Sequence, residues 1–239
     1  RRLVEICNRH GLRGTFHLNG GLLGTEGRIP ASEVAGLYAG HEVSAHTLTH
    51  PTIARCPLPQ VARQILEDRR ILEDLTGYTV RGMSYPNGSF SADIQGILPG
   101  LGIEYARVVG NSGAFGLPGD PLAWMATCHH KAELLTRTRE FRTLAKTQYL
   151  YLFYVWGHSY EFDNDNNWEL IEEFAATAGR QADTWYATNI EIIDYLAAAR
   201  RVRYAESGAF AENPAATPVW ISVDGRIVEL APGASTRLA

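Results

Sequence analysis

Two histidines, His46 and His50, stand four residues apart in the segment HTLTHP, with Pro51 directly after them. In a helical turn this spacing brings both rings to one side, where two imidazoles can bind one metal ion. The alternative is that both are ordinary polar side chains at the junction of a loop and a helix. The spacing therefore predicts a helical turn over residues 46–50 and makes a metal site a hypothesis to weigh against the residues around it.

The elements that must position these histidines follow from the hydrophobic pattern. Short apolar runs alternate with amphipathic segments through most of the chain. Strands are predicted over residues 15–18, 41–45, 79–86, 104–109, 149–156 and 183–187, and helices over 1–11, 32–38, 57–77, 91–98, 166–179 and 188–201. This alternation predicts an α/β fold with a parallel sheet and outer helices, either open or closed into a barrel.

Two segments have a more specific pattern. The run YLYLFYVW at residues 149–156 is apolar on both faces, which predicts a buried strand. Near the end of the chain, VWISVDGRIVEL contains two alternating runs joined by Asp224-Gly225, a strong hairpin signal. We therefore expect an α/β domain over residues 1–202 and a small β appendage over 203–239.

Polar features follow several of the predicted strands. They are the His46–His50 segment, the turn SYPNG that contains Tyr85 and Asn87, the loop around Asp120, and WGHSYEF, which contains His158. In parallel α/β proteins, sites form at the carboxyl ends of strands. We expect these features to converge on one rim of the sheet.

Taken in order, these motifs resemble those of the polysaccharide deacetylases, which are NodB-like carbohydrate esterases. HEVSAHTLTHP is similar to the second motif of that family, and SYPNG and VWGHSYEF are similar to its third and last motifs. The resemblance extends over about residues 1–200. It implies a distorted barrel of about seven strand–helix units and a metal-dependent deacetylase.

The resemblance also implies roles for individual residues. His46 and His50 would bind a divalent metal, expected to be Zn²⁺, which would polarise the acetyl carbonyl and acidify its water. The backbone N–H of Asn87 would help to hold the oxyanion. His158 would protonate the leaving group, and Asp120, which precedes Trp124, would tune that acid.

The chain departs from the family pattern in two places. The family's first motif ends in two aspartates, one a metal ligand and the other the general base, and no Asp-Asp pair occurs in this sequence. We expect that motif, and with it the third ligand, an Asp, to lie upstream of Arg1. The barrel would then be incomplete, with an unpaired sheet edge beside residues 15–18. Ser84 stands where the family has an Arg that orients the base, and Arg81 is offset from that position.

Further side chains could contact a sugar. Tyr85, Trp124 and Tyr160 are predicted to bind substrate, whereas Trp156 is more typical of a core residue. His129 and His130 are adjacent, and adjacent side chains of a strand point apart. We therefore expect substrate contact or solvation for these two, and no shared metal ion.

Composition limits the function classes. The chain has 239 residues, 45% hydrophobic and 20% charged, with a net charge of -4 and no long basic run. Nucleic acid is therefore not an expected partner, and no apolar run approaches the roughly 20 residues of a membrane span. Three scattered cysteines favour a reducing, cytoplasmic compartment. Oligomeric state and a signal peptide cannot be deduced from these residues.

The leading interpretation is a metal-dependent hydrolase that removes acetyl groups from an amino sugar or an acetylated glycan. Two alternatives are kept. One is a catalytically inactive carbohydrate-binding protein, because the aspartate pair and the Arg are missing from the sequence. The other is a related metal-dependent amidase that acts on non-sugar amides, since the same metal chemistry would serve both.

Overall fold

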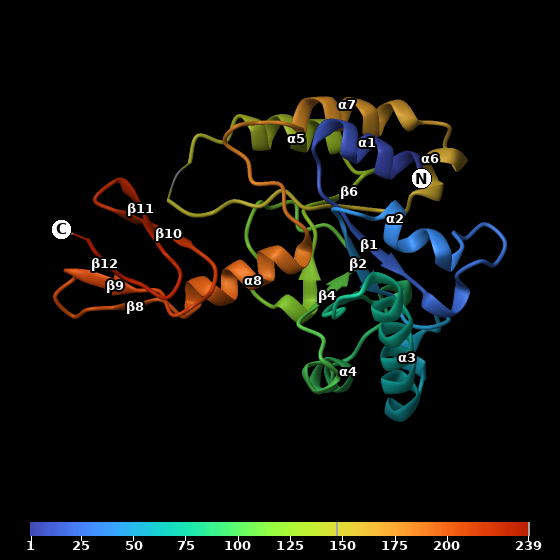
Figure 1. Ribbon diagram of the computed structural model, residues 1–239. Helices are drawn as coiled ribbons and strands as arrows, with labels where there is room; N and C mark the ends of the chain where they lie inside the picture. The colour runs from blue at the N-terminus through green and yellow to red at the C-terminus, as the bar shows by residue number, and fades with distance from the viewer. Residues whose placement is uncertain (147, 239) are drawn as a thin grey trace. The chain divides into compact units, whose positions relative to one another are not determined.

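The computed structural model describes residues 1–146 and 148–238 (Figure 1). It divides into two compact units, Arg1–Asn189 and Ile190–Ala239. The division predicted from the sequence, between residues 202 and 203, stays a prediction. Among the described helices, none combines the length and apolar character that a bilayer span requires.

The first unit is built on a parallel five-stranded sheet whose strands follow one another in chain order. This confirms the α/β class with a parallel central sheet. In the described residues β1 and β5 are the two edges, and no closed barrel forms. The strands are β1 (Thr15–Leu18), β2 (Glu42–Ala45), β3 (Gly82–Ser84), β4 (Tyr105–Val108) and β5 (Trp124–Met125). A separate parallel pair consists of β6 (Cys128–His129) and β7 (Val155–Trp156).

Helices cover the sheet in two groups. The long helix α3 contacts β2 and α4, and α1 and α5 both contact α7, as Figure 1 shows. Gly11 and Gly77 end α1 and α3 in the left-handed conformation, as the sequence predicts. The helices of this unit are α1 (Arg2–His10), α2 (Val34–Leu37), α3 (Leu58–Thr76), α4 (Ala92–Ile97), α5 (Leu134–Arg142), α6 (Tyr160–Asn164) and α7 (Trp168–Ala178).

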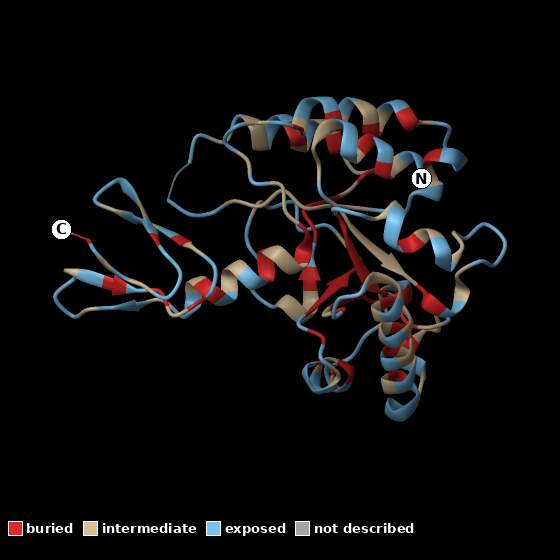
Figure 2. Cartoon of the chain, in the orientation of Figure 1, coloured by how far each residue is buried: buried red, intermediate tan, exposed pale blue. Residues whose placement is uncertain are grey.

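The two faces of the sheet differ in chemistry. Side chains of a strand alternate between faces, and residues in register on neighbouring strands share a face. One face is apolar and forms the core under α3, including Val43, Ala45, Met83, Ala106 and Val108. The other is largely polar yet buried, and its rows include His17, Ser44, Ser84, Tyr105, Arg107 and Trp124. Figure 2 shows how deeply these strands are buried.

Hydrogen bonds satisfy much of the polar face. The hydroxyl of Tyr105 donates to Glu42 Oε1 at 2.6 Å and lies 3.0 Å from Ser44 Oγ, and Thr15 Oγ1 donates to Glu42 Oε2 at 2.8 Å. A buried polar group costs stability unless it is paired in this way. This face leads at its carboxyl end to the predicted site.

Two strand predictions were wrong. In the segment 149–156 only Val155 and Trp156 are in a strand, because their partner β6 is two residues long. The side chains of Tyr149 and Leu150 are 78% and 57% exposed. Residues 183–187 form no strand, and Trp185 is 60% exposed. Apolar content alone did not distinguish these segments from buried strands.

The second unit begins in α8 (Asn189–Arg200) and continues as β-structure. The predicted hairpin is confirmed: β10 (Val219–Val223) pairs with β11 (Arg226–Leu230). Its turn residues have positive φ, 48° at Asp224 and 78° at Gly225, as this turn type requires. A second sheet contains β12 (Ser235–Arg237), β9 (Phe210–Glu212) and β8 (Arg203–Tyr204).

Candidate active site

The segment that carries His46 and His50 is a loop directly after β2, and the predicted helical turn is wrong. Thr47 and His50 have φ angles of 67° and 60°, a left-handed conformation that is uncommon outside glycine. The ring centroids of the two histidines nevertheless lie 4.7 Å apart. The rings meet because the loop folds back on itself, and backbone conformations of this kind concentrate at functional sites.

Asp68 of α3 fixes this loop through hydrogen bonds to its backbone. Its Oδ1 accepts from the Gly20 N–H at 2.5 Å, and its Oδ2 accepts from the His46 N–H at 2.8 Å. Burial raises the pKa of Asp68 to about 7, against the effect of these hydrogen bonds. Asp68 is therefore a buried carboxyl group whose two oxygens are committed to the backbone of two loops.

The sequence contains a signal for Asp68 that the predictions did not use. Val61, Ile65 and Leu72 form the buried stripe of α3, and Asp68 lies on the same stripe with 0% exposure. A carboxylate in an apolar stripe is rarely buried without a partner. The helix itself was predicted, over residues 57–77, and is present as α3.

His46 has the hydrogen bonds expected of a metal-binding imidazole. Its Nδ1 lies 2.8 Å from the carbonyl oxygen of Ser84 and 2.8 Å from Ser84 Oγ. Donation to the carbonyl places the proton on Nδ1 and leaves the Nε2 lone pair free. Burial, with the nearby charges of His50, Arg107 and His158, lowers the pKa of His46 to about 3. The ring is therefore neutral, the form that binds a metal ion.

The turn after β3 places Asn87 beside the loop of His50. Asn87 has a φ of 55°, and its Nδ2 donates to Thr52 Oγ1 at 3.1 Å. In the described residues its backbone N–H has no acceptor, so this donor is available to a ligand. Tyr85 differs from its predicted role: it is 1% exposed, its ring stacks on Phe90, and its hydroxyl donates to the Leu122 carbonyl.

His158 follows β7 and contacts Glu161. Its backbone N–H donates to Glu161 Oε2 at 3.0 Å, and its Nδ1 lies 3.2 Å from the same oxygen. Its charge lowers the pKa of both His46 and His50, which places it within electrostatic reach of that pair. Donation from Nδ1 leaves Nε2 as the nitrogen available for proton transfer.

In the described residues, the hydrogen bonds of Asp120 are not with His158. Its Oδ1 accepts from the Leu122 N–H at 2.9 Å, and its Oδ2 accepts from Gln95 Nε2 at 2.9 Å. The structure therefore brings Glu161 to His158, and it engages Asp120 in capping a short turn. The sequence signal for Glu161 was its position three residues after His158 in the predicted motif.

His129 and His130 do not point apart, contrary to the prediction. Their ring centroids are 4.4 Å apart, and their Nε2 atoms lie 3.2 Å and 2.9 Å from Glu161 Oε2. The backbone turns directly after His129, at the end of β6, and strand alternation no longer applies. One ligand atom of each of these three residues lies within 4.8 Å of the others, a geometry that could hold a metal ion.

Protonation argues against a metal ion at this second cluster. The Lys131 N–H donates to His129 Nδ1 at 3.1 Å, so the neutral ring carries its proton on Nε2. That proton faces Glu161, where a metal ion would need a lone pair. The cluster is therefore better described as a carboxylate surrounded by donors. The same test favours His46, whose Nε2 is free.

The aromatic residues divide by exposure. Trp124 is 2% exposed and packs against Tyr105 and Tyr154, with ring centroids at 5.8 Å and 5.0 Å, so its predicted contact with substrate is not available to its ring. Tyr160 is 58% exposed and its ring lies 5.2 Å from that of His158. Of the predicted aromatic contacts, Tyr160 alone is both exposed and beside His158.

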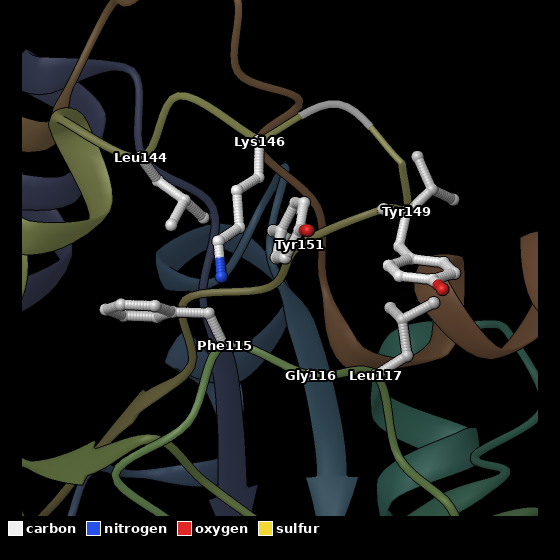
Figure 3. Close-up of a pocket in the computed structure, with 8 residues that line it drawn as sticks. Phe115, Gly116, Leu117, Leu144, Lys146, Tyr149 and Tyr151 are labelled. Atoms are coloured by element: carbon white, nitrogen blue, oxygen red, sulfur yellow. The ribbon is translucent and has the colours of Figure 1, made fainter.

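A surface hollow of about 420 Å³ is lined by none of the site residues described above (Figure 3). In the figure, Lys146 extends between Phe115 and Tyr151. The described lining contains no histidine and no carboxylate. The hollow therefore offers no ligand set for a metal ion and no acid–base pair.

Comparison with known proteins places these residues in context. Residues 1–106 match the family model described as polysaccharide deacetylase, a span that contains His46, His50 and Asn87 but not His158. A chitooligosaccharide deacetylase of Sinorhizobium fredii is 31% identical over 93 residues, 38% of this chain and 42% of that protein. A chitooligosaccharide deacetylase of Rhizobium leguminosarum bv. phaseoli is 32% identical over 71 residues, 30% of each chain. The chain thus spans less than half the length of these relatives.

Solved structures support the fold. A 4-alpha-glucanotransferase of Thermococcus litoralis superposes with a TM-score of 0.58 at 16% identity, covering 81% of this chain and 35% of that one. A CE4 family pseudoenzyme of Bacillus anthracis gives a TM-score of 0.51 at 18% identity, covering 80% of this chain and 59% of that one. At these identities the likeness concerns the fold alone.

Proposed function

The chain is a relative of the polysaccharide deacetylases over residues 1–106, and on that basis we propose that it is a metal-dependent hydrolase of acetylated amino sugars or glycans. The observation that carries the proposal is the protonation state and position of the His46 ring. Its Nδ1 is committed to Ser84, its ring is neutral, and its free Nε2 belongs to a ring 4.7 Å from that of His50. Two neutral imidazoles so placed fit a Zn²⁺ ion.

The ligand set proposed for the metal is His46, His50 and a third ligand, the Asp that the family resemblance leads us to expect upstream of Arg1. In the described residues, His46 and His50 form no group of three ligand atoms with a further His, Cys, Asp or Glu. The general base belongs to the same proposal, as the second aspartate of that motif. The barrel of about seven strand–helix units is also kept as a proposal.

A bound divalent metal would polarise the acetyl carbonyl and lower the pKa of water. The Asn87 N–H, which has no acceptor in the described residues, donates to the oxygen on which negative charge develops. His158 gives a proton from Nε2 to the leaving amine or alcohol, while Glu161 accepts from Nδ1 and holds the ring in place. Tyr160, exposed beside His158, supplies an apolar surface for a sugar ring.

The test measures zinc binding and acetate release from chitooligosaccharides by the full-length natural protein. His46→Ala and His50→Ala are expected to weaken zinc binding by about 100-fold or more, since each removes a ligand. Both should abolish acetate release. His10→Ala is the matched control, because His10 lies on α1 and its nearest charged partner is Glu172. Unchanged zinc binding and activity in both variants would exclude the metal site.

A second candidate function is a catalytically inactive carbohydrate-binding protein. The absence of a third ligand from the described residues near His46 and His50 favours it. One solved relative is a CE4 family pseudoenzyme, and a mutant of it is described as having restored enzymatic activity. Glycan binding that survives a chelator, with no acetate release by the full-length protein, would support this function. A related amidase on non-sugar amides would be separated by its substrate profile.

A further inference from the structure

Arg107 is a buried cation with no counter-ion in the described part of the chain. Its residue exposure is 6%, and its guanidinium lies over the ring of Trp156, 4.5 Å from the centroid. In residues 1–146 and 148–238, the guanidinium makes no ion pair or hydrogen bond. An aromatic face offsets part of the cost of burying a cation, but it does not replace an anion.

The guanidinium is deeply buried but not fully enclosed. Within the described ranges, the fully enclosed side-chain atoms without a partner are His130 Nδ1 and Asn167 Oδ1, and no nitrogen of Arg107 is among them. Each unpaired nitrogen of Arg107 therefore retains some accessible surface. An anion could reach these donors without displacing an existing hydrogen bond.

The sheet register directs Arg107 toward the candidate active site. Arg107 is in register with Ser84, and parallel strands place residues in register on the same face. The Ser84 side chain contacts His46 Nδ1 on that face. The positive charge of Arg107 also lowers the pKa of His46 and of His17. Arg107 is thus a fixed positive charge that acts on His46, one of the two proposed metal ligands.

We propose that Arg107 is the anion-binding group of this site and that its ligand is a carboxylate. A guanidinium presents paired N–H donors that match the two oxygens of a carboxylate, and the Trp156 stack fixes the plane of that fork. The carboxylate has two possible sources, the acetate released by deacetylation or an acidic group of the sugar. The assignment of either source rests on the proposed function; the binding of a carboxylate by Arg107 does not.

The experiment measures the binding of sodium acetate and of sodium D-glucuronate to the full-length protein by isothermal titration and by NMR. Acetate represents the free product, and glucuronate represents a carboxylate carried by a sugar. Binding of acetate alone identifies a product site, and binding of glucuronate identifies an acidic-substrate site. Arg107→Gln is expected to weaken binding of the preferred probe at least tenfold, and Arg107→Lys should weaken it less.

Two controls keep the result specific. Arg81→Gln removes an arginine from the same sheet that is paired with Glu104, and should leave carboxylate binding unchanged. Trp156→Phe keeps Arg107 and an aromatic face for its guanidinium. It is the second variant to measure if Arg107→Gln proves unstable. Equal affinity in wild type and Arg107→Gln, or no binding of either probe, would overturn the proposal. Zinc binding by the same samples shows separately whether the proposed function fails.

Discussion

Glu161 is surrounded by nitrogen atoms at a single oxygen. The backbone N and Nδ1 of His158 lie 3.0 Å and 3.2 Å from its Oε2, and Nε2 atoms of His130 and His129 lie at 2.9 Å and 3.2 Å. Burial would raise the pKa of Glu161, but the hydrogen bonds from His130 and His158 outweigh it and lower the pKa to about 2. The Glu161 carboxyl is therefore ionised at neutral pH.

This depressed pKa gives a prediction for acid stability. A carboxyl whose folded pKa lies below its ordinary 4.5 stabilises the fold above pH 4.5, and that contribution is lost as pH falls toward 2. Glu161→Gln should therefore lower the free energy of unfolding at pH 7 and flatten its fall between pH 4.5 and 2. Urea unfolding at a series of pH values measures both effects.

Asp74→Asn is the control for Glu161→Gln. Asp74 is 71% exposed and pairs with Arg70 at 3.7 Å, so its substitution should change unfolding by less than about 0.5 kcal/mol. If the free energy of unfolding of Glu161→Gln varies with pH as that of the wild type does, the stability of the cluster does not depend on the charge of Glu161.

At the residue scale, the sequence predicted the residues that belong to motifs and missed the buried residues that interact with them. His46, His50 and His158 stand out by spacing and by position after strands. Asp68 and Arg107 do not, since each lies inside an element that reads as ordinary core or strand. Their roles depend on contacts with chain segments 20 or more residues away, such as Asp68 with His46 at 22, which no local pattern contains.

At the scale of elements, the close approach of β3 and β4 depends on Gly82. Gly82 is in register with Tyr105, and a Cβ atom at Gly82 would overlap the Tyr105 ring. That ring lies across the glycine, and its hydroxyl reaches Glu42 and Ser44 on the neighbouring strand β2. The missing side chain of Gly82 is thus a condition for the polar network of the sheet.

Gly82→Ala is expected to destabilise the protein by about 1–3 kcal/mol, because the Tyr105 ring or the strand must move. Gly36→Ala is the matched control: nothing lies within 4 Å of its added Cβ, and alanine favours the helix α2. Thermal unfolding of both variants measures the difference. A Gly82→Ala protein as stable as wild type would mean that Tyr105 leaves this position at no cost.

Element predictions succeeded where periodicity was strong and failed where it was weak. The amphipathic stripe of α3 and the hairpin around Asp224 were predicted and are present. The run at 149–156 was misjudged because a strand also needs a partner of matching length, and β6 is two residues long. That requirement is a property of another segment of the chain.

At the scale of the whole molecule, the two units have separate hydrophobic cores. The core of the second unit is small and rich in alanine, and its members are Ala198, Ala211, Ala215, Val219, Leu230 and Leu238. None of these belongs to the two cores of the first unit. A small core contributes little stability, so we expect the second unit to open at lower free energy than the first.

Leu230→Ala tests this separation. Leu230 is fully buried, and its truncation should destabilise the second unit by about 2–4 kcal/mol through the cavity left behind. Hydrogen exchange should accelerate at the amides of β10 and β11 and remain unchanged at those of α3. Ile227→Ala, on the same strand but 73% exposed, should alter neither. Equal acceleration in both units would show that they unfold as one.

The shared oxygens of Glu42 have a further consequence for how this sheet can vary. Thr15 and Tyr105 each donate to one oxygen of that carboxylate, and the Tyr105 hydroxyl also reaches Ser44. Replacing Glu42 alone removes this shared acceptor from the buried hydroxyl of Tyr105 and from Thr15, whereas exchanging the set together for apolar side chains leaves no such donor behind. Drift at these sites should therefore be strongly epistatic, with homologues keeping or discarding the set as a whole.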